Sequence, residues 1–280
     1  MLYQELQPHP SLRAHIACYF FMKLGVGAPP EELVFPDGTP GLMIIEQARF
    51  TRYCPLEQKE RRQLSGSYLF GQKARPVHYA FDTPGFACFG VKFQPPGLRV
   101  FTTLPAFELT DTLVEAAQLL KAPFRELENK LLSAPCITER KALLDEYFIG
   151  QIPPQPDAGL GLVQQALAYI HRRRGQLDIT ELSEKFQLNY KALERLFKKY
   201  VGLTPKAYCC LTRFNATLLH RQHHQHGSLT RLAYDSGYFD QMHFIREVKQ
   251  FTNLRPGEFY PGGFGKIGAH QQQLVAERLR

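Results

Sequence analysis

Short apolar runs bounded by glycine and proline dominate the first half of the chain. They are aromatic or β-branched, a pattern typical of strands. Further along, apolar residues recur every three or four positions, which indicates helices. Strands are predicted at 33–35, 42–45, 67–70, 77–81 and 86–93, and helices at 113–120, 124–131 and 143–148. Residues 1–150 are therefore predicted to form a β-rich domain that ends in helices.

A segment rich in proline and glycine separates this half from the rest. Residues 150–159 contain three prolines and two glycines, which neither a helix nor a central strand accommodates. We predict a linker at 151–158. From Leu162 onward the periodicity is helical almost throughout. The predicted fold class is therefore α+β, with an all-α domain at 159–262 and a flexible, glycine-rich tail at 263–280.

Two segments of the second half resemble each other. Residues 179–205 and 229–256 each show a helix, a tight turn and a second helix. Matching positions are 50 residues apart before the turn and 51 after it, so one turn is a residue longer. Leu182 and Leu232 match and are predicted to face inward.

Capping residues mark the predicted helix ends in both copies. Residue types that cap helix N-termini precede or begin each helix, and residue types that tolerate a left-handed backbone follow the second helices. The predicted N-caps are Thr180 and Asn189 in the first copy and Thr230 and Asp240 in the second, and the residues after the second helices are Gly202 and Asn253.

The second helix of each copy has an apolar stripe and an opposite polar face. A helix fits the major groove of DNA, where Arg can take both acceptors of guanine and Gln can bridge adenine, while Lys can reach phosphates. Two such helices on one body can enter successive major grooves about 34 Å apart. The candidate DNA-binding residues are Tyr190, Lys191, Glu194, Arg195 and Lys198 in the first copy and Gln241, Met242, His243, Arg246 and Lys249 in the second. Two ordinary amphipathic hairpins would also have solvated faces, but matched caps and turns favour paired helix-turn-helix units.

The excess positive charge lies with this repeat. The whole chain has a net charge of +8, but residues 1–158 contribute −1 and residues 159–280 contribute +9. A basic module beside a near-neutral one indicates a polyanionic partner for the basic module alone. Charge by itself fits both a membrane surface and nucleic acid, and the repeat favours nucleic acid.

The sequence gives little support for other chemistry. It has no apolar run long enough to span a membrane and no secretion signal at its start, so we expect a cytoplasmic protein without a membrane partner. Its six cysteines form no C-x-x-C pair and are expected to be reduced. No P-loop, G-x-G-x-x-G or G-x-S-x-G motif occurs. We therefore expect no cofactor, no metal and no enzyme activity.

The histidines and cysteines leave alternatives open. His220, His223, His224 and His226 cluster at the end of the helix that connects the two copies of the repeat, where metal binding is conceivable. No nearby Cys or carboxylate completes a site, so a solvated connector is favoured. A redox-sensing cysteine or a DNA-repair alkyl acceptor would need a thiolate with activating neighbours, and the sequence shows none.

The helical half resembles the DNA-binding domain of the AraC/XylS family of transcription regulators. The resemblance runs from about Gly161 to Tyr260, roughly a third of the chain, and rests on residues 193–205 and 233–246 and on the connecting helix. It implies a long central helix that joins two helix-turn-helix lobes. The base-reading positions that it implies are Lys191, Glu194, Arg195, Gln241, Met242 and Arg246.

Three positions depart from the family pattern. Gln187 stands where the first turn usually has Gly, so that this turn is expected to be strained or shifted. Val248 replaces a usual Phe, which thins the core of the second lobe. Glu194 places an acid on the groove face, where it would accept from cytosine or repel phosphate.

The N-terminal half resembles a sensor-type domain that precedes this DNA-binding domain in some bacterial regulators, through residues 33–38, 90–97 and 108–111. The wider family has an effector-binding or dimerising domain here, often cupin-like. We therefore expect a sequence-specific bacterial transcription regulator, gated by a small molecule or partner. Its expected partners are double-stranded DNA, RNA polymerase if it activates, and a second copy if the domain dimerises. A non-specific architectural DNA binder is the remaining alternative.

Overall fold

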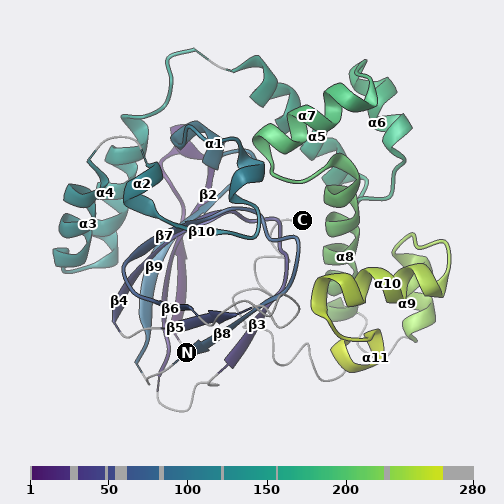
Figure 1. Ribbon diagram of the computed structural model, residues 1–280, viewed down its shortest axis with the longest axis horizontal. Helices are drawn as coiled ribbons and strands as arrows, with labels where there is room; N and C mark the ends of the chain where they lie inside the picture. The colour runs from purple at the N-terminus through teal and green to yellow at the C-terminus, as the bar shows by residue number, and fades with distance from the viewer. Residues whose placement is uncertain are drawn as a thin grey trace.

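A β-rich domain is followed by a helical region (Figure 1). The computed structural model describes residues 2–25, 31–47, 50–53, 62–81, 85–120, 123–155, 157–223 and 228–260. The predicted tail lies outside these residues, as do Cys54, His224 and His226. No helix in the described residues is long and apolar enough to cross a membrane.

The larger sheet has six strands in the order β1-β2-β9-β4-β7-β10, and all of its pairings are antiparallel. The strands are β1 (Leu2–Leu6), β2 (Ile16–Lys23), β4 (Gly41–Gln47), β7 (Ser67–Phe70), β9 (Ala87–Phe93) and β10 (Leu113–Glu115). β9 is central and buried at every position, which explains its apolar sequence. Gly90 in β9 has no room for a side chain, because a Cβ atom would lie 1.9 Å from the carbonyl oxygen of Leu42 in β4.

The smaller sheet packs on one face of the larger one. Its strands, in the order β3-β8-β5-β6, are β3 (Glu31–Val34), β8 (Val77–Phe81), β5 (Phe50–Tyr53) and β6 (Arg62–Leu64). Aromatic rings line the space between the sheets. The rings of Phe50 and Phe86, for example, meet edge to face with 5.6 Å between their centroids.

Helices cover the other face of the larger sheet. They are α1 (Leu98–Phe101), α2 (Ala116–Leu119), α3 (Phe124–Ser133) and α4 (Ile137–Ile149), with short 3-10 turns η1 (Pro10–Leu12) and η2 (Ala106–Leu109). Phe93 of β9 packs with Phe101 and Phe148 in the core of this layer. The domain therefore has two apolar cores, one on each face of the larger sheet.

The structure confirms the α+β class and corrects one element. All five predicted strands are present, as β3, β4, β7, β8 and β9, and the helices predicted at 124–131 and 143–148 lie within α3 and α4. The helix predicted at 113–120 is wrong in its first part, since residues 113–115 form β10. They pair with the otherwise open edge of β7, and this backbone pairing prevails over the helical spacing of apolar residues. Strands β1, β2, β5 and β6 were not predicted.

The helical region has two lobes joined by a long helix, as expected. Its helices are α5 (Ala158–Arg172), α6 (Ile179–Phe186), α7 (Tyr190–Tyr200), α8 (Pro205–His223), α9 (Leu229–Asp235), α10 (Gln241–Thr252) and α11 (Pro256–Glu258). α8 runs from the lobe of α5–α7 to the lobe of α9–α11 (Figure 1). Fully buried rings of Phe197, Phe214 and Phe244 belong to one core that serves both lobes.

The β-rich domain contacts both parts of the helical region. Phe35, directly after β3, is fully buried, and its ring meets those of Phe214 and Phe259 edge to face at 5.8 and 6.2 Å between centroids. The Thr110 hydroxyl, after η2, donates a hydrogen bond of 2.9 Å to the Gly202 carbonyl, after α7. Each lobe therefore has its own contact with the N-terminal domain.

Candidate nucleic-acid interface

The first helix-turn-helix consists of α6, a tight turn and α7. Gln187 ends α6 in the left-handed conformation, with φ 52° and ψ 38°. The Gln187 N–H donates to the Glu184 carbonyl at 3.2 Å, and the Leu188 N–H donates to the Ser183 carbonyl at 3.0 Å. These two bonds define a Schellman motif. The turn expected to be strained or shifted thus keeps its regular hydrogen bonds, with a non-glycine residue in a conformation that costs about 1 kcal/mol.

The second helix-turn-helix, α9 to α10, closes its turn in the same pattern. Gly237 has φ 76° and corresponds to Gln187, and two backbone hydrogen bonds of 3.0 and 3.1 Å close the motif. Aligning these positions leaves Phe239 as the additional residue before Asp240. The side chain of Phe239 is 90% exposed. The one-residue difference between the repeats is therefore an aromatic ring in the turn that faces solvent.

The caps predicted for α7 and α10 are confirmed. The side chains of Asn189 and Asp240 each accept a hydrogen bond from the backbone N–H of the third helical residue, at 2.9 and 2.6 Å. At the other ends, Gly202 and Asn253 have φ values of 92° and 61°, the left-handed conformation predicted for them. The sequence therefore located both ends of both candidate reading helices.

The caps predicted for α6 and α9 are wrong. Asp178 caps α6 and accepts from the Thr180 N–H at 2.8 Å, whereas Ser228 caps α9 and accepts from the Arg231 N–H at 3.2 Å. In each copy an apolar residue stands between the true cap and the threonine. Including that residue in the helix places its side chain against the core, so each cap lies two residues before Thr180 or Thr230 and each helix starts one residue before it.

The five candidate residues of α7 lie on one face of the helix. Tyr190, Lys191, Arg195 and Lys198 are exposed, and Glu194 is partly buried. Glu194 Oε1 lies 2.7 Å from Lys198 Nζ, an ion pair one turn apart. Because this pair balances the acidic charge, Lys191 and Arg195 supply the net positive charge of the face.

Four of the five candidate residues of α10 also face solvent. Gln241, Met242, Arg246 and Lys249 are exposed, and Met242 has 61% of its surface accessible. His243 lies differently, with its Nε2 atom 3.0 Å from Glu247 Oε1. Its imidazole therefore has a partner within the protein, and its role in binding DNA stays a prediction.

A buried ion pair lies beneath α10. Glu247 is 5% exposed and accepts hydrogen bonds from the guanidinium of Arg213 in α8, which also lies 4.9 Å from the centroid of the Tyr238 ring. Burial alone would lower the pKa of Arg213, but the bonds and charge of Glu247 raise it above its ordinary value. This pair attaches α10, the second candidate reading helix, to the central helix α8.

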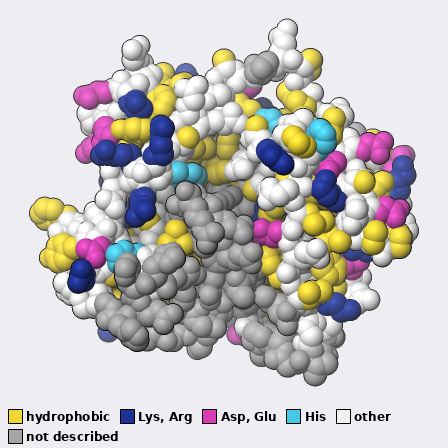
Figure 2. Space-filling view, turned by 180° about the vertical axis from the view of Figure 1, so that it is seen from behind, with side chains coloured by type: hydrophobic (Ala, Val, Ile, Leu, Met, Phe, Trp, Pro, Cys, Tyr) yellow, Lys and Arg dark blue, Asp and Glu magenta, His cyan; other side chains and the backbone are white. Residues whose placement is uncertain are grey.

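Sequence reasoning missed two exposed aromatic residues beside these helices. Phe239 precedes the α10 cap, and Tyr234 in α9 is 59% exposed. In Figure 2, hydrophobic side chains form the outer edge of the α9–α11 lobe, and Lys and Arg side chains gather over the α5–α7 lobe. The sequence did carry a signal for Phe239. The offset between the two copies changes from 50 to 51 residues, which marks an inserted residue in the second turn.

The structure describes the surroundings of two cysteines and one histidine that bear on the cysteine and metal alternatives. Burial raises the pKa of Cys209 and of Cys210 to about 12, so both thiols in α8 are protonated at neutral pH. His220 Nε2 lies 3.6 Å from Asp235 Oδ2. Among the described residues, no three His, Cys, Asp or Glu side chains form a group that could hold a metal ion.

Two family models match the chain in separate segments. One, described as a helix-turn-helix domain, matches residues 182–260. The other, described as a domain of unknown function (DUF6597), matches residues 4–115. The first contains all ten candidate residues of α7 and α10, and the second covers both sheets except the first two residues of β1.

Curated relatives and a solved structure extend these matches. HTH-type transcriptional activators named RhaS, from Salmonella arizonae and Salmonella newport, are each 31% identical over 81 residues. These residues are 29% of this chain and 29% of each relative, so the chain spans less than a third of the relatives' length. A structure of ToxT from Vibrio cholerae has a TM-score of 0.50 and covers 90% of this chain and 99% of that one, at 9% identity. That likeness concerns the fold alone.

Proposed function

We propose that the protein reads specific DNA sequences with α7 and α10, because residues 182–260 match a helix-turn-helix domain and 81 residues are 31% identical to HTH-type transcriptional activators. The proposed base-reading side chains are Lys191, Glu194, Arg195, Gln241, Met242 and Arg246. Tyr190, His243, Lys198 and Lys249 lie beside them, and the two lysines are proposed to contact phosphates. In this proposal the protein is a transcription regulator and not an enzyme.

The observation that carries this proposal is the duplicated geometry of the two lobes. Each lobe places a capped helix of 11 or 12 residues with one face exposed, and both helices lie in the basic part of the chain. A shared core and a shared central helix hold the lobes together. Two exposed helices on one body suit two successive major grooves.

Regulation is proposed to act through the N-terminal domain. Phe35 and Thr110 connect this domain to the two lobes, so a ligand or partner that shifts it would change how α7 and α10 are presented to DNA. We propose action in the cytoplasm, where bacterial DNA lies. A second copy would bind a second site in the operator, and an activating mode would add contact with RNA polymerase.

Fluorescence anisotropy with the full-length protein tests the proposal. The protein is titrated with DNA from upstream of its own gene and with the same DNA scrambled, at about 50 to 200 mM salt. We expect a preference of about a thousandfold for the natural sequence at physiological salt.

Equal binding to both DNAs with a steep salt dependence would indicate contacts to phosphates alone. A selection from random sequences then separates a wrongly chosen operator from an architectural binder. Enrichment of a motif supports sequence-specific reading, whereas selection without enrichment refutes it.

A further inference from the structure

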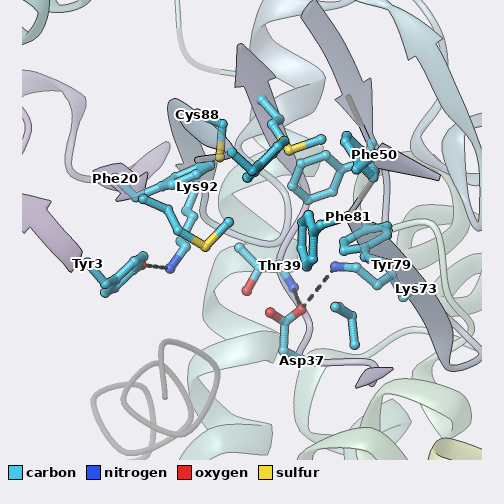
Figure 3. Close-up of a pocket in the computed structure, with 15 residues that line it drawn as sticks. Tyr3, Phe20, Asp37, Thr39, Phe50, Lys73, Tyr79, Phe81, Cys88 and Lys92 are labelled. Carbon is cyan, nitrogen blue, oxygen red and sulfur yellow. Dashed lines mark hydrogen bonds and ion pairs between the residues drawn. The ribbon is translucent and has the colours of Figure 1, made fainter. Parts of the chain in front are cut away.

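A cavity lies between the two sheets of the N-terminal domain (Figure 3). Its volume is about 80 Å³, roughly half that of an engineered cavity of about 150 Å³ that binds benzene. Seven of the fifteen residues that line it are aromatic, among them Phe20, Phe50, Tyr79, Phe81 and Phe86. Met22 and Met43 also line it, and their unbranched side chains can adapt to a guest. A single aromatic ring therefore fits only when the Met22 and Met43 side chains move aside.

Two polar side chains in this cavity have unused hydrogen-bonding capacity. The Thr39 hydroxyl is buried and has no hydrogen-bond partner among the described residues. Lys73 is also buried, and its Nζ atom lies 3.6 Å from Asp37 Oδ1, too far for a hydrogen bond. A buried hydroxyl without a hydrogen-bond partner is unfavourable, and Lys73, although paired with Asp37, can still donate hydrogen bonds. The Thr39 hydroxyl and the Lys73 ammonium group therefore indicate a guest with an oxygen atom that accepts hydrogen bonds.

The charges around the cavity already balance. Lys73 faces Asp37, and Lys92 pairs with Glu5 at 2.7 Å while donating a hydrogen bond to the Tyr3 hydroxyl. Each lysine in the wall therefore has its own carboxylate. A charged guest would be buried without a counter-ion, which is strongly unfavourable. The balance therefore favours an uncharged guest.

The segment that carries the polar end of the cavity also reaches the helical region. Thr39 lines the cavity, whereas Phe35, four residues earlier, lies in the core of the helical region against Phe214 and Phe259. Only a short stretch of backbone separates the two positions. A hydrogen bond formed by Thr39 can therefore change how Phe35 packs on the second lobe.

We propose that this cavity binds an uncharged molecule of about one ring in size, apolar except for one hydroxyl or carbonyl oxygen. Lys73 and Thr39 donate hydrogen bonds to that oxygen, and the aromatic wall surrounds the ring. Binding is transmitted along residues 35–39 to the lobe of α9–α11 and alters the affinity for DNA. The transmission rests on the proposed function, whereas the binding site does not.

The four methionines of the chain provide separate reporters for the two sites. Met22 and Met43 line the cavity, and Met242 lies on the exposed face of α10. Full-length protein labelled with carbon-13 at the methionine methyl groups is titrated with phenol, and Met→Leu variants assign the signals. We expect phenol to shift the Met22 and Met43 signals saturably.

Toluene and benzoate are the matched probes. Toluene has the ring and a methyl group in place of the hydroxyl, and benzoate adds a negative charge. We expect both to bind about tenfold more weakly than phenol, because one loses the hydrogen bonds and the other buries an unpaired charge. No saturable shift with phenol, or equal binding of benzoate, overturns the proposed site.

Two variants test the residues involved. Thr39→Val keeps the shape but removes the hydroxyl, and it should weaken phenol about tenfold while leaving toluene unchanged. Equal weakening of both probes would mean that the cavity has changed shape and that Thr39 does not recognise the oxygen. The methyl spectrum of the free variant serves as the check on its fold.

Phe35→Leu tests the transmission. In the natural protein, phenol should change the affinity for operator DNA about fivefold or more. The variant should still bind phenol, but its DNA affinity should no longer respond. Transmission through Phe35 is refuted if phenol still changes the DNA affinity of the variant. It is also refuted if phenol does not change the DNA affinity of the natural protein. Shifts of Met242 on adding DNA without phenol test the proposed function separately.

Discussion

The two helix-turn-helix lobes share one sequence pattern, yet different forces hold their reading helices. When the two copies are aligned with the 51-residue offset, Leu196 of α7 corresponds to Glu247 of α10. Leu196 packs on the apolar core, whereas Glu247 pairs with Arg213. The first reading helix is thus held by apolar contacts and the second also by a buried charge pair. The comparison shows that a repeated motif can conserve geometry while changing the interactions that maintain it.

The turns differ in the same way. The first lobe forms its Schellman motif with Gln187, and the second forms it with Gly237 and adds Phe239. The first turn therefore carries backbone strain and no exposed ring, whereas the second has an unstrained glycine and an aromatic side chain in solvent. These differences predict separate effects on stability and on DNA binding.

The largest expected effect on stability comes from giving α10 the apolar residue that α7 has at the corresponding position. Glu247→Leu leaves the largely buried Arg213 guanidinium without a carboxylate partner and should lower the free energy of unfolding by about 3 kcal/mol. Urea unfolding measures this loss. Glu194→Ala, which breaks the exposed pair with Lys198, should cost less than about 0.5 kcal/mol. Adding Arg213→Leu to Glu247→Leu should restore much of the stability, and failure to do so would contradict the unpaired-charge explanation.

Arg246→Ala should weaken binding to the preferred DNA by about 1–3 kcal/mol and relax the base preference in one half-site. The reason is that Arg246 is exposed on α10, where its guanidinium can bind a base edge. Binding to a panel of single-base operator variants measures the preference. Lys198→Ala is the control from the other lobe, and it should weaken all sequences alike and flatten the salt dependence. Unchanged preference with Arg246→Ala would remove this residue from base reading.

Phe239→Ala should leave stability unchanged, because the side chain is 90% exposed. If the ring contacts DNA from the second turn, the affinity should fall by about 1 kcal/mol, since apolar side chains pack on thymine methyl groups. Anisotropy and thermal unfolding measure the two quantities. Leu188→Ala, in the corresponding part of the first turn, is the contrasting variant and should lower stability because Leu188 packs on the core. A loss of stability with Phe239→Ala would show that the ring has a structural role.

The smallest effect concerns backbone strain. Gln187→Gly should raise the free energy of unfolding by about 0.5 kcal/mol, because glycine adopts φ 52° without strain but has more freedom in the unfolded chain. Gly237→Ala, with φ 76°, should lower it by about 1 kcal/mol through strain, and the Gln176 side chain must also move, since the new Cβ would lie 2.4 Å from its Cδ atom. Thermal unfolding of both variants gives the comparison. Equal effects in the same direction would show that strain at these turns is not the deciding factor.

The sequence predicted best what depends on neighbouring residues. Asn189 and Asp240 were identified as caps because their partners lie within the same turn of helix. The caps Asp178 and Ser228 were missed because a threonine two residues later is also a capping type, and only core packing decides between them. Local pattern therefore located both reading helices but not the start of the helices before them.

Features that join distant segments could not be predicted. The Arg213–Glu247 pair connects residues 34 positions apart on two helices, and periodicity carries no information about such a pair. β10 becomes a strand only because β7 offers it an open edge. The cavity likewise exists only once the two sheets are packed. The candidate reading face was predicted from the sequence. The Arg213–Glu247 pair that holds α10 and the cavity between the sheets were seen only in the structure.

The burial of Phe35 limits whether the two domains can be separated by proteolysis. The ring fills a place in the core of the helical region although it belongs to the N-terminal domain. Proteolytic removal of that domain would leave a gap beside Phe214 and Phe259 and expose both rings to water. Exposed apolar patches of this kind promote self-association. The DNA-binding fragment released by a protease is therefore expected to aggregate and be degraded, so cleavage between the domains would end regulation rather than leave a constitutively active regulator.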